Sequence, residues 1–156
     1  MSRTNPLNST VPISLHRVTS AWGEGTSNAG DPGGTGTTAT PGDATWIHTF
    51  YPGSLWTTPG GDYLALISAT TLVRDIGTYT WTSAQLIADV QSMLDNPAAN
   101  FGWELIGDEA SSFSNAKRFE TRETTAAGRS PQLAIDWTFP VGVSESQWTA
   151  VKALYR

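Results

Sequence analysis

The sequence predicts an all-β domain: an antiparallel β-sandwich of jelly-roll type with one short covering helix at about residues 82–95 and a short C-terminal helix. Several short segments alternate apolar and polar residues, and loops rich in Gly, Pro, Ser and Thr separate them. Only one internal stretch has a clear helical period. With 156 residues and 38% hydrophobic content, the chain has room for one core. We expect a sandwich domain at residues 1–140 and a tail at residues 141–156.

The N-terminal half is expected to hold short strands around one long loop. Val11, Ile13 and Leu15 alternate with less apolar residues, which is typical of a strand with one buried face. Residues 20–42 are too rich in Gly and Pro for regular structure. Further strands are then expected at residues 44–50, 63–67, 71–75 and 78–81.

The helix and the later strands have clearer patterns. Thr82 and Gln85 form a capping box, and Asn96-Pro97 ends the helix. The apolar face of this helix consists of Leu86, Ile87, Val90 and Leu94. Strands follow at residues 101–105, 117–123 and 133–139, with Trp103 and Trp137 expected in the core. Ser144 and Gln147 cap the last short helix.

Charge and composition disfavour several classes of function. The net charge of −5, without a stripe of Lys or Arg, disfavours nucleic acid and anionic membrane surfaces as partners. The chain has no Cys, which excludes disulfides and thiolate chemistry. No stretch approaches the roughly 18 apolar residues of a membrane span.

Aromatic and acidic side chains among glycines form the first candidate site. Trp22, Trp46 and Trp56 could stack on sugar rings and bind a hydroxyl through the indole N–H, and Glu24 and Asp62 complete this set of ligand-binding candidates. The same tryptophans could instead anchor long loops onto the core, because Trp is highly buried on average. The sequence leaves both interpretations open.

A charged strand forms the second candidate site. If residues 117–123 are extended, Arg118, Glu120 and Arg122 share one face. The two arginines could grip the carboxylate of an acidic sugar. Alternatively, the three side chains form a ladder that pairs with neighbouring strands and fixes their register.

Metal binding and catalysis are weakly indicated. Asp31, Asp43 and Asp62 lie in turns, where they could bind a structural Ca²⁺ or, more simply, close Asx turns. His16 and His48 lack the spacing of zinc ligands, so the identity of any metal ligand stays unknown and no cofactor is expected. A glycosidase would need two carboxylates about 5–10 Å apart. Candidates for that pair are Glu104, Asp108, Glu109, Glu120 and Glu123.

Eight short pieces together carry a family resemblance. In chain order they are Leu15-His16-Arg17-Val18, Trp22-Gly23-Glu24-Gly25, Gly42-Asp43-Ala44-Thr45-Trp46, Trp56, Gly60-Gly61-Asp62, Asp89-Val90-Gln91, Asn100-Phe101-Gly102-Trp103 and Lys117-Arg118-Phe119-Glu120-Thr121-Arg122-Glu123. In this order, residues 13–139 resemble the C-terminal part of a DNRLRE (disaggregatase-related) domain. The resemblance implies a carbohydrate-binding jelly roll of secreted or cell-surface proteins, without catalytic activity.

The resemblance also implies that strands preceding Leu15 in the family are missing here. We therefore expect exposed strand edges and self-association through them. The expected function is a non-catalytic extracellular module that binds a polysaccharide, with an acidic glycan as one option, and that targets or anchors a larger protein. The alternatives are a structural or adhesive domain without a glycan site and, more remotely, a glycan-cleaving enzyme.

Overall fold

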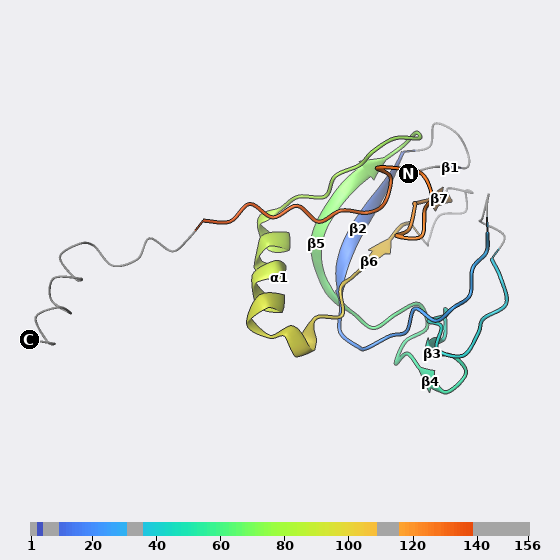
Figure 1. Ribbon diagram of the computed structural model, residues 1–156. Coiled ribbons are helices and arrows are strands. Elements are labelled where there is room, and N and C mark those ends of the chain that lie inside the picture. Colours follow the sequence, from blue (N-terminus) through green and yellow to red (C-terminus); the bar gives the residue numbers. More distant parts are fainter. Residues whose placement is uncertain (1–2, 5–9, 31–35, 109–115, 139–156) are drawn as a thin grey trace, which may run out of the picture. The chain divides into compact units, whose positions relative to one another are not determined.

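The computed structural model describes residues 3–4, 10–30, 36–108 and 116–138. By its internal contacts the chain divides into two units, residues 1–120 and residues 121–156, which are described separately below. The first unit is rich in antiparallel strands and contains one α-helix among its described residues (Figure 1). The prediction of a helix-poor, sheet-rich fold is confirmed; the jelly-roll sandwich stays a prediction.

A three-stranded antiparallel sheet forms the centre of the first unit. Strand β2 (Val11–Val18) lies between β5 (Tyr63–Val73) and β6 (Trp103–Ile106). The two strands expected at residues 63–67 and 71–75 are therefore one continuous strand. Register shifts on both sides of His16 allow β5 to stay paired with β2 to its end, because they absorb extra residues of β5.

The apolar face of β2 forms a small core. Val11 and Ile13 are buried with Val73, which lies opposite Val11 in β5. Tyr79, Trp81 and Phe119 pack against this cluster. The indole N–H of Trp81 also donates to the carbonyl of Ile13 at 2.8 Å, so this ring is fixed both by packing and by a hydrogen bond.

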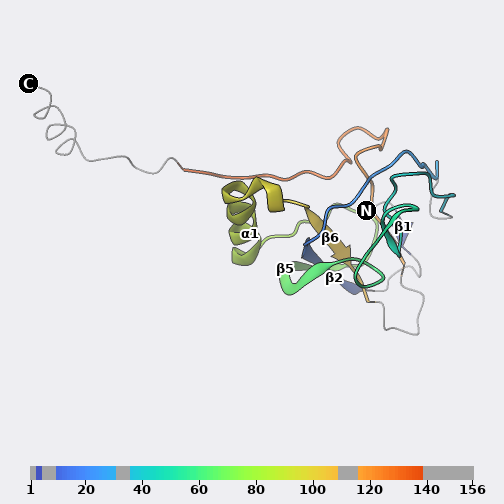
Figure 2. The ribbon, with the colours of Figure 1, turned by 90° about the horizontal axis from the view of Figure 1, so that it is seen from below.

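Helix α1 (Ala84–Asp95) lies beside β5, as Figures 1 and 2 show, and is followed by a one-turn 3₁₀ helix, η1 (Pro97–Ala99). The expected cap is wrong by one residue: Ser83, not Thr82, accepts a hydrogen bond from the N–H of Leu86. The hydroxyl of Ser83 also donates to the carbonyl of Ser68, which ties the start of the helix to β5.

The buried face of α1 matches the predicted one in part. Leu86 and Val90 are half-buried as expected, whereas Ile87 and Leu94 are exposed. The fully buried residues are Met93 and Asp89, and the carboxylate of Asp89 accepts a 2.5 Å hydrogen bond from Ser68 in β5. The buried face therefore combines apolar residues with one hydrogen-bonded carboxylate.

Two short strand pairs complete the described structure. Strand β3 (His48–Phe50) pairs with β4 (Ser54–Leu55), and β1 (Arg3–Thr4) pairs with β7 (Lys117–Arg118), both antiparallel. The strand expected at residues 44–50 thus begins only at His48, and residues 78–81 form no strand. The strand expected at residues 101–105 is confirmed but begins at Trp103.

The predictions for the C-terminal part are largely wrong where they can be compared. The strand expected at residues 117–123 ends at Arg118, and residues 131–138 form no strand although their pattern alternates. Trp137 is 67% exposed rather than part of the core, whereas Trp103 is half-buried. A strand needs a partner, and no strand among the described residues pairs with 131–138. The helix expected near Ser144 lies outside the described residues.

Candidate functional site

The loops at residues 19–25 and 40–62, called the loop layer below, close tightly on one another. The N–H of Gly23 donates to Thr49 at 3.0 Å, and the carbonyl of Gly23 accepts from Ala44 at 2.7 Å. Tyr51 in turn donates to the carbonyl of Asp43 at 2.7 Å. These loops contain little regular structure, yet backbone hydrogen bonds fix their geometry as a sheet would.

The carboxylate of Asp43 holds the first turn of the loop layer. It accepts hydrogen bonds from the N–H of Thr40 at 2.5 Å and from the N–H of Ser27 at 3.4 Å. The hydrogen bond from the Thr40 backbone, followed by those from Ser27, lowers the pKa of Asp43 below its usual value. Gly25 has a φ of +61°, and a Cβ there would collide with this carboxylate. The motif at residues 22–25 therefore packs closely against the motif at residues 42–46, and the glycine at position 25 allows this contact.

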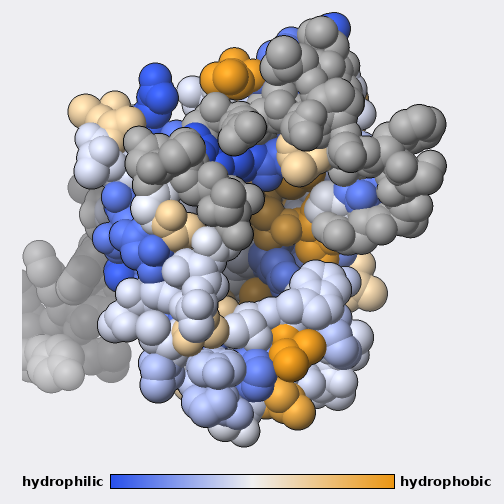
Figure 3. All heavy atoms as spheres, turned by 90° about the vertical axis from the view of Figure 1, so that its right-hand side faces the viewer, coloured by the Kyte–Doolittle hydropathy of each residue, from blue (hydrophilic) through white to orange (hydrophobic). Residues whose placement is uncertain are grey.

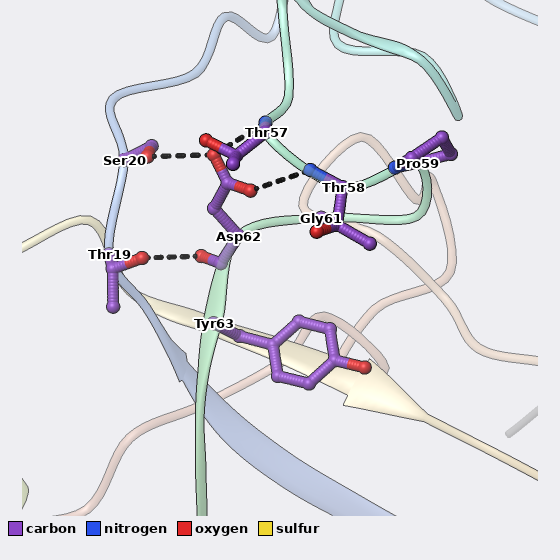
Figure 4. Close-up of a pocket in the computed structure, with 8 residues that line it drawn as sticks. All are labelled: Thr19, Ser20, Thr57, Thr58, Pro59, Gly61, Asp62 and Tyr63. Atoms are coloured by element: carbon purple, nitrogen blue, oxygen red, sulfur yellow. Dashed lines mark hydrogen bonds between the residues drawn. The ribbon is translucent and has the colours of Figure 1, made fainter.

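The carboxylate of Asp62 holds a second turn (Figure 4). It accepts from the N–H of Thr57 at 3.0 Å, the N–H of Thr58 at 3.1 Å and the hydroxyl of Ser20 at 3.1 Å. The pKa of Asp62 is lowered, chiefly by the Thr57 N–H, because each donor favours the ionised form. The sequence predicts Asp62 as a ligand-binding residue; in the structure its carboxylate holds the surrounding backbone through hydrogen bonds.

A recess of about 460 Å³ opens beside Asp62. Most of its lining side chains carry a hydroxyl group. The lining residues are Thr19, Ser20, Thr57, Thr58, Pro59, Gly61, Asp62 and Tyr63. In Figure 4 the ring of Tyr63 lies on the opposite side of this space from the turn at Thr57 and Thr58. The volume is within the usual range for small-ligand sites, about 300–1,000 Å³.

The three tryptophans of the candidate platform have different roles. The indole N–H of Trp22 donates to Phe101 at 2.9 Å, and that of Trp56 donates to Thr45 at 2.8 Å. Both anchor loops through carbonyl groups, although Trp22 keeps 45% of its surface exposed. Trp46 is 65% exposed, and its ring would lie 2.9 Å from a Cβ at Gly60, but neither residue is among those that line the recess. Of the three, Trp46 best fits a surface platform.

Glu104 approaches the recess from β6. It lies opposite His16 in the β2–β6 register, and its carboxylate fills the space that a Cβ at Gly61 would need. Partial burial raises the pKa of Glu104, and the nearby charge of His16 opposes that shift. His16 is buried; its Nδ1 lies 2.8 Å from the carbonyl of Leu64, and its ring meets the Tyr63 ring edge-on at 5.1 Å.

The two arginines expected to bind an acidic sugar do not share a strand face. Arg118 lies in β7 opposite Arg3, and Arg122 belongs to the second unit, where it forms an exposed 2.9 Å ion pair with Glu123. The expected common face is wrong because the chain leaves the strand after Arg118 and turns at residues 121–124. Glu24 is exposed and is not among the residues that line the recess.

Sequence reasoning missed the hydroxyl-bearing residues of the site. The pattern at residues 63–67 predicts Tyr63 only as a strand residue, and no motif marks Ser20, Thr57 or Thr58. The sequence offers a weak signal, since two threonines stand a few residues before an Asp that Tyr63 follows directly. No turn motif marks this spacing, because Asp62 accepts from N–H groups four and five residues earlier rather than closing an Asx turn.

Comparison with family models, curated proteins and solved structures finds no match for this chain. The resemblance to DNRLRE domains therefore stays a prediction. Within the described ranges, no three His, Cys, Asp or Glu side chains gather in a way that could hold a metal ion. In the same part of the chain, no helix has the length and apolar character needed to cross a membrane.

Proposed function

We propose that this chain is a non-catalytic polysaccharide-binding module that acts outside the cell and holds a larger protein on a glycan, as its resemblance to DNRLRE domains implies. The observation that carries the proposal is the recess beside Asp62, which is lined by the exposed aromatic residue Tyr63. Ligand sites commonly combine an aromatic surface with a few fixed polar groups, and this recess has both.

The chemistry of the recess suits a sugar ring. The C–H face of a pyranose can stack on Tyr63 or Trp46, and both rings are at least 41% exposed. The hydroxyls of Thr57 and Thr58 can donate to and accept from sugar hydroxyls. The edge-on contact with His16 fixes the Tyr63 ring before ligand arrives, which limits the entropy lost on binding.

The environment of Asp62 favours binding over catalysis. A glycosidase needs one carboxylate to act as a base or nucleophile and another to act as an acid. Both oxygens of Asp62 are already engaged by backbone N–H groups, and the lowered pKa makes this carboxylate a weak base. Release of reducing ends or unsaturated sugars from any polymer would contradict the non-catalytic assignment.

Affinity electrophoresis through gels that contain soluble polysaccharides tests the proposal. We expect at least one polymer to slow the wild type, and Trp46→Ala and Tyr63→Leu to restore normal migration. Trp137→Ala is the matched control, because Trp137 is equally exposed but belongs to the other unit. Migration that no polymer affects would contradict the proposed function.

A self-associating structural domain is the second candidate. Leu66 and Leu72 lie on β5, an edge strand among the described residues, and are 60% and 65% exposed. Apolar residues are also exposed on the side of β3 and β4, at the lower end of the view in Figure 3. Exposed apolar strand edges favour pairing with another chain.

Light scattering after gel filtration separates the two candidates. Self-association through β5 predicts a mass that rises with concentration, and Leu72→Lys should reduce it to that of a monomer. A mass that stays monomeric at all concentrations would contradict the second candidate and leave the binding module unaffected.

A further inference from the structure

We infer that the recess beside Asp62 takes a neutral sugar ring and rejects a uronic acid. This inference rests on the proposed binding function and adds the chemical class of the ligand. It differs from the acidic glycan that Arg118 and Arg122 suggested, because neither arginine is among the residues that line the recess.

The charges at the recess carry the argument. Among the described residues that line it, Asp62 is the one charged side chain, and none is Lys or Arg. The backbone donors of Thr57 and Thr58 hold Asp62 in its ionised form. A carboxylate on the ligand would thus meet a like charge without the arginine fork that usually binds carboxylates in proteins.

Glu104 adds a second carboxylate, which lies next to Gly61 in the lining of the recess. Its side chain lies against Gly61, whose φ of +131° and missing Cβ allow this close approach. A substitution at Gly61 would push Glu104 away, so the backbone itself keeps the acid near the recess. Asp62 supplies a field against anions at the lining itself, and Glu104, whose charge His16 partly offsets, adds to it. The effect should weaken as salt screens it.

The remaining lining groups suit a neutral ligand. Thr19 donates its hydroxyl to the carbonyl of Asp62 at 3.0 Å, and Ser20 donates to the carboxylate. Each of these hydroxyls retains lone pairs that can accept from a sugar O–H. Acceptors fixed in this way match the O–H donors of a polyol. A neutral ring also avoids the free-energy cost of removing a charge from water.

The test compares neutral and acidic polymers at low salt. Xylan and galactomannan serve as neutral probes, and alginate and polygalacturonate serve as acidic probes, in affinity gels with the wild-type chain. We expect retention on at least one neutral polymer and at least about tenfold weaker retention on the acidic ones. Retention on acidic polymers that equals or exceeds that on neutral ones would overturn the inference but leave the binding function intact. Retention on none would overturn both.

A charge-neutralising variant checks the cause. Glu104→Gln should increase retention on acidic polymers relative to retention on neutral polymers. Asp75→Asn is the matched control, because it removes the same charge beyond the opposite end of β5 from the recess. If both variants increase acidic retention equally, net charge rather than the recess sets the selectivity, and the inference fails.

Discussion

Two regions differ from what their sequences suggest: the loop layer at residues 19–25 and 40–62 is well fixed, and the segment at residues 131–138 forms no regular structure. The loop layer has many glycines and little strand pattern, yet two carboxylates and two indoles fix it through hydrogen bonds. The segment has clear alternation, yet every one of its side chains is exposed and no strand forms. A local pattern becomes structure only where partners satisfy the backbone and cover the apolar face.

The largest expected difference between the two regions comes from glycine substitutions. Gly25→Ala should destabilise the protein by about 2–4 kcal/mol, because it combines a left-handed φ with a collision against Asp43. Gly128→Ala, at a similar φ of +72° in open space, should cost at most about 1–2 kcal/mol. Urea denaturation measures both. Equal losses of unfolding free energy in the two variants would show that the turn at Asp43 can move to accommodate a Cβ at Gly25.

Acid should weaken the loop layer before it affects the segment. The folded pKa values of Asp43 and Asp62 are lowered, so their contribution to stability is present above the unfolded value of 3.8 and is lost as pH falls through the folded values. Urea midpoints between pH 7 and pH 2 should therefore fall at the acid end. Asp62→Asn should make that fall shallower, whereas Asp136→Asn in the segment should not.

The indole hydrogen bonds should have a smaller effect. Trp56→Phe removes the donor to Thr45 and should lower the free energy of unfolding by about 1 kcal/mol. Ile135→Ala in the exposed segment should change it by less than about 0.5 kcal/mol. A larger effect at Ile135 than at Trp56 would mean that the segment is packed in solution, which would reverse the comparison.

The smallest effect is expected at Glu104. Its folded pKa is raised, so folding makes protonation more favourable than it is in the unfolded chain, and stability declines as pH rises from the unfolded value of 4.5 through the folded value. Glu104→Gln should remove this decline and raise stability near neutral pH by less than about 0.5 kcal/mol, since half of the group faces solvent. Glu123→Gln, in an exposed ion pair, should leave the pH profile unchanged.

Much of the first unit could be predicted from its sequence. Strand β2 alternates plainly, and β6 and α1 lie where their patterns placed them. The register shifts that let β5 continue across both predicted strands, and the burial of Asp89 in α1, depend on contacts between segments distant in sequence. Sequence patterns indicate the local preference for helix or strand, so they do not predict contacts between distant segments.

The candidate site was predictable only in part. The motifs at residues 42–46 and 60–62 do lie at the loop layer, and Trp46 is exposed there. The anchoring of Trp22 depends on Phe101, which is 79 positions away in the chain, and no spacing rule foretells it. Arg122 was grouped with Arg118 because a strand was expected to continue, and the turn at residues 121–124 separates them.

The hydrogen bond from Trp22 to Phe101 has a consequence for biosynthesis. The loop layer also meets a later residue where Glu104 lies against Gly61, and Val18, at the end of β2, donates to the carbonyl of Gly102 at 3.0 Å. These contacts form on a nascent chain only after residues 101–104 leave the ribosome. Fragments that end before residue 100 would carry every residue that lines the recess and lack these contacts.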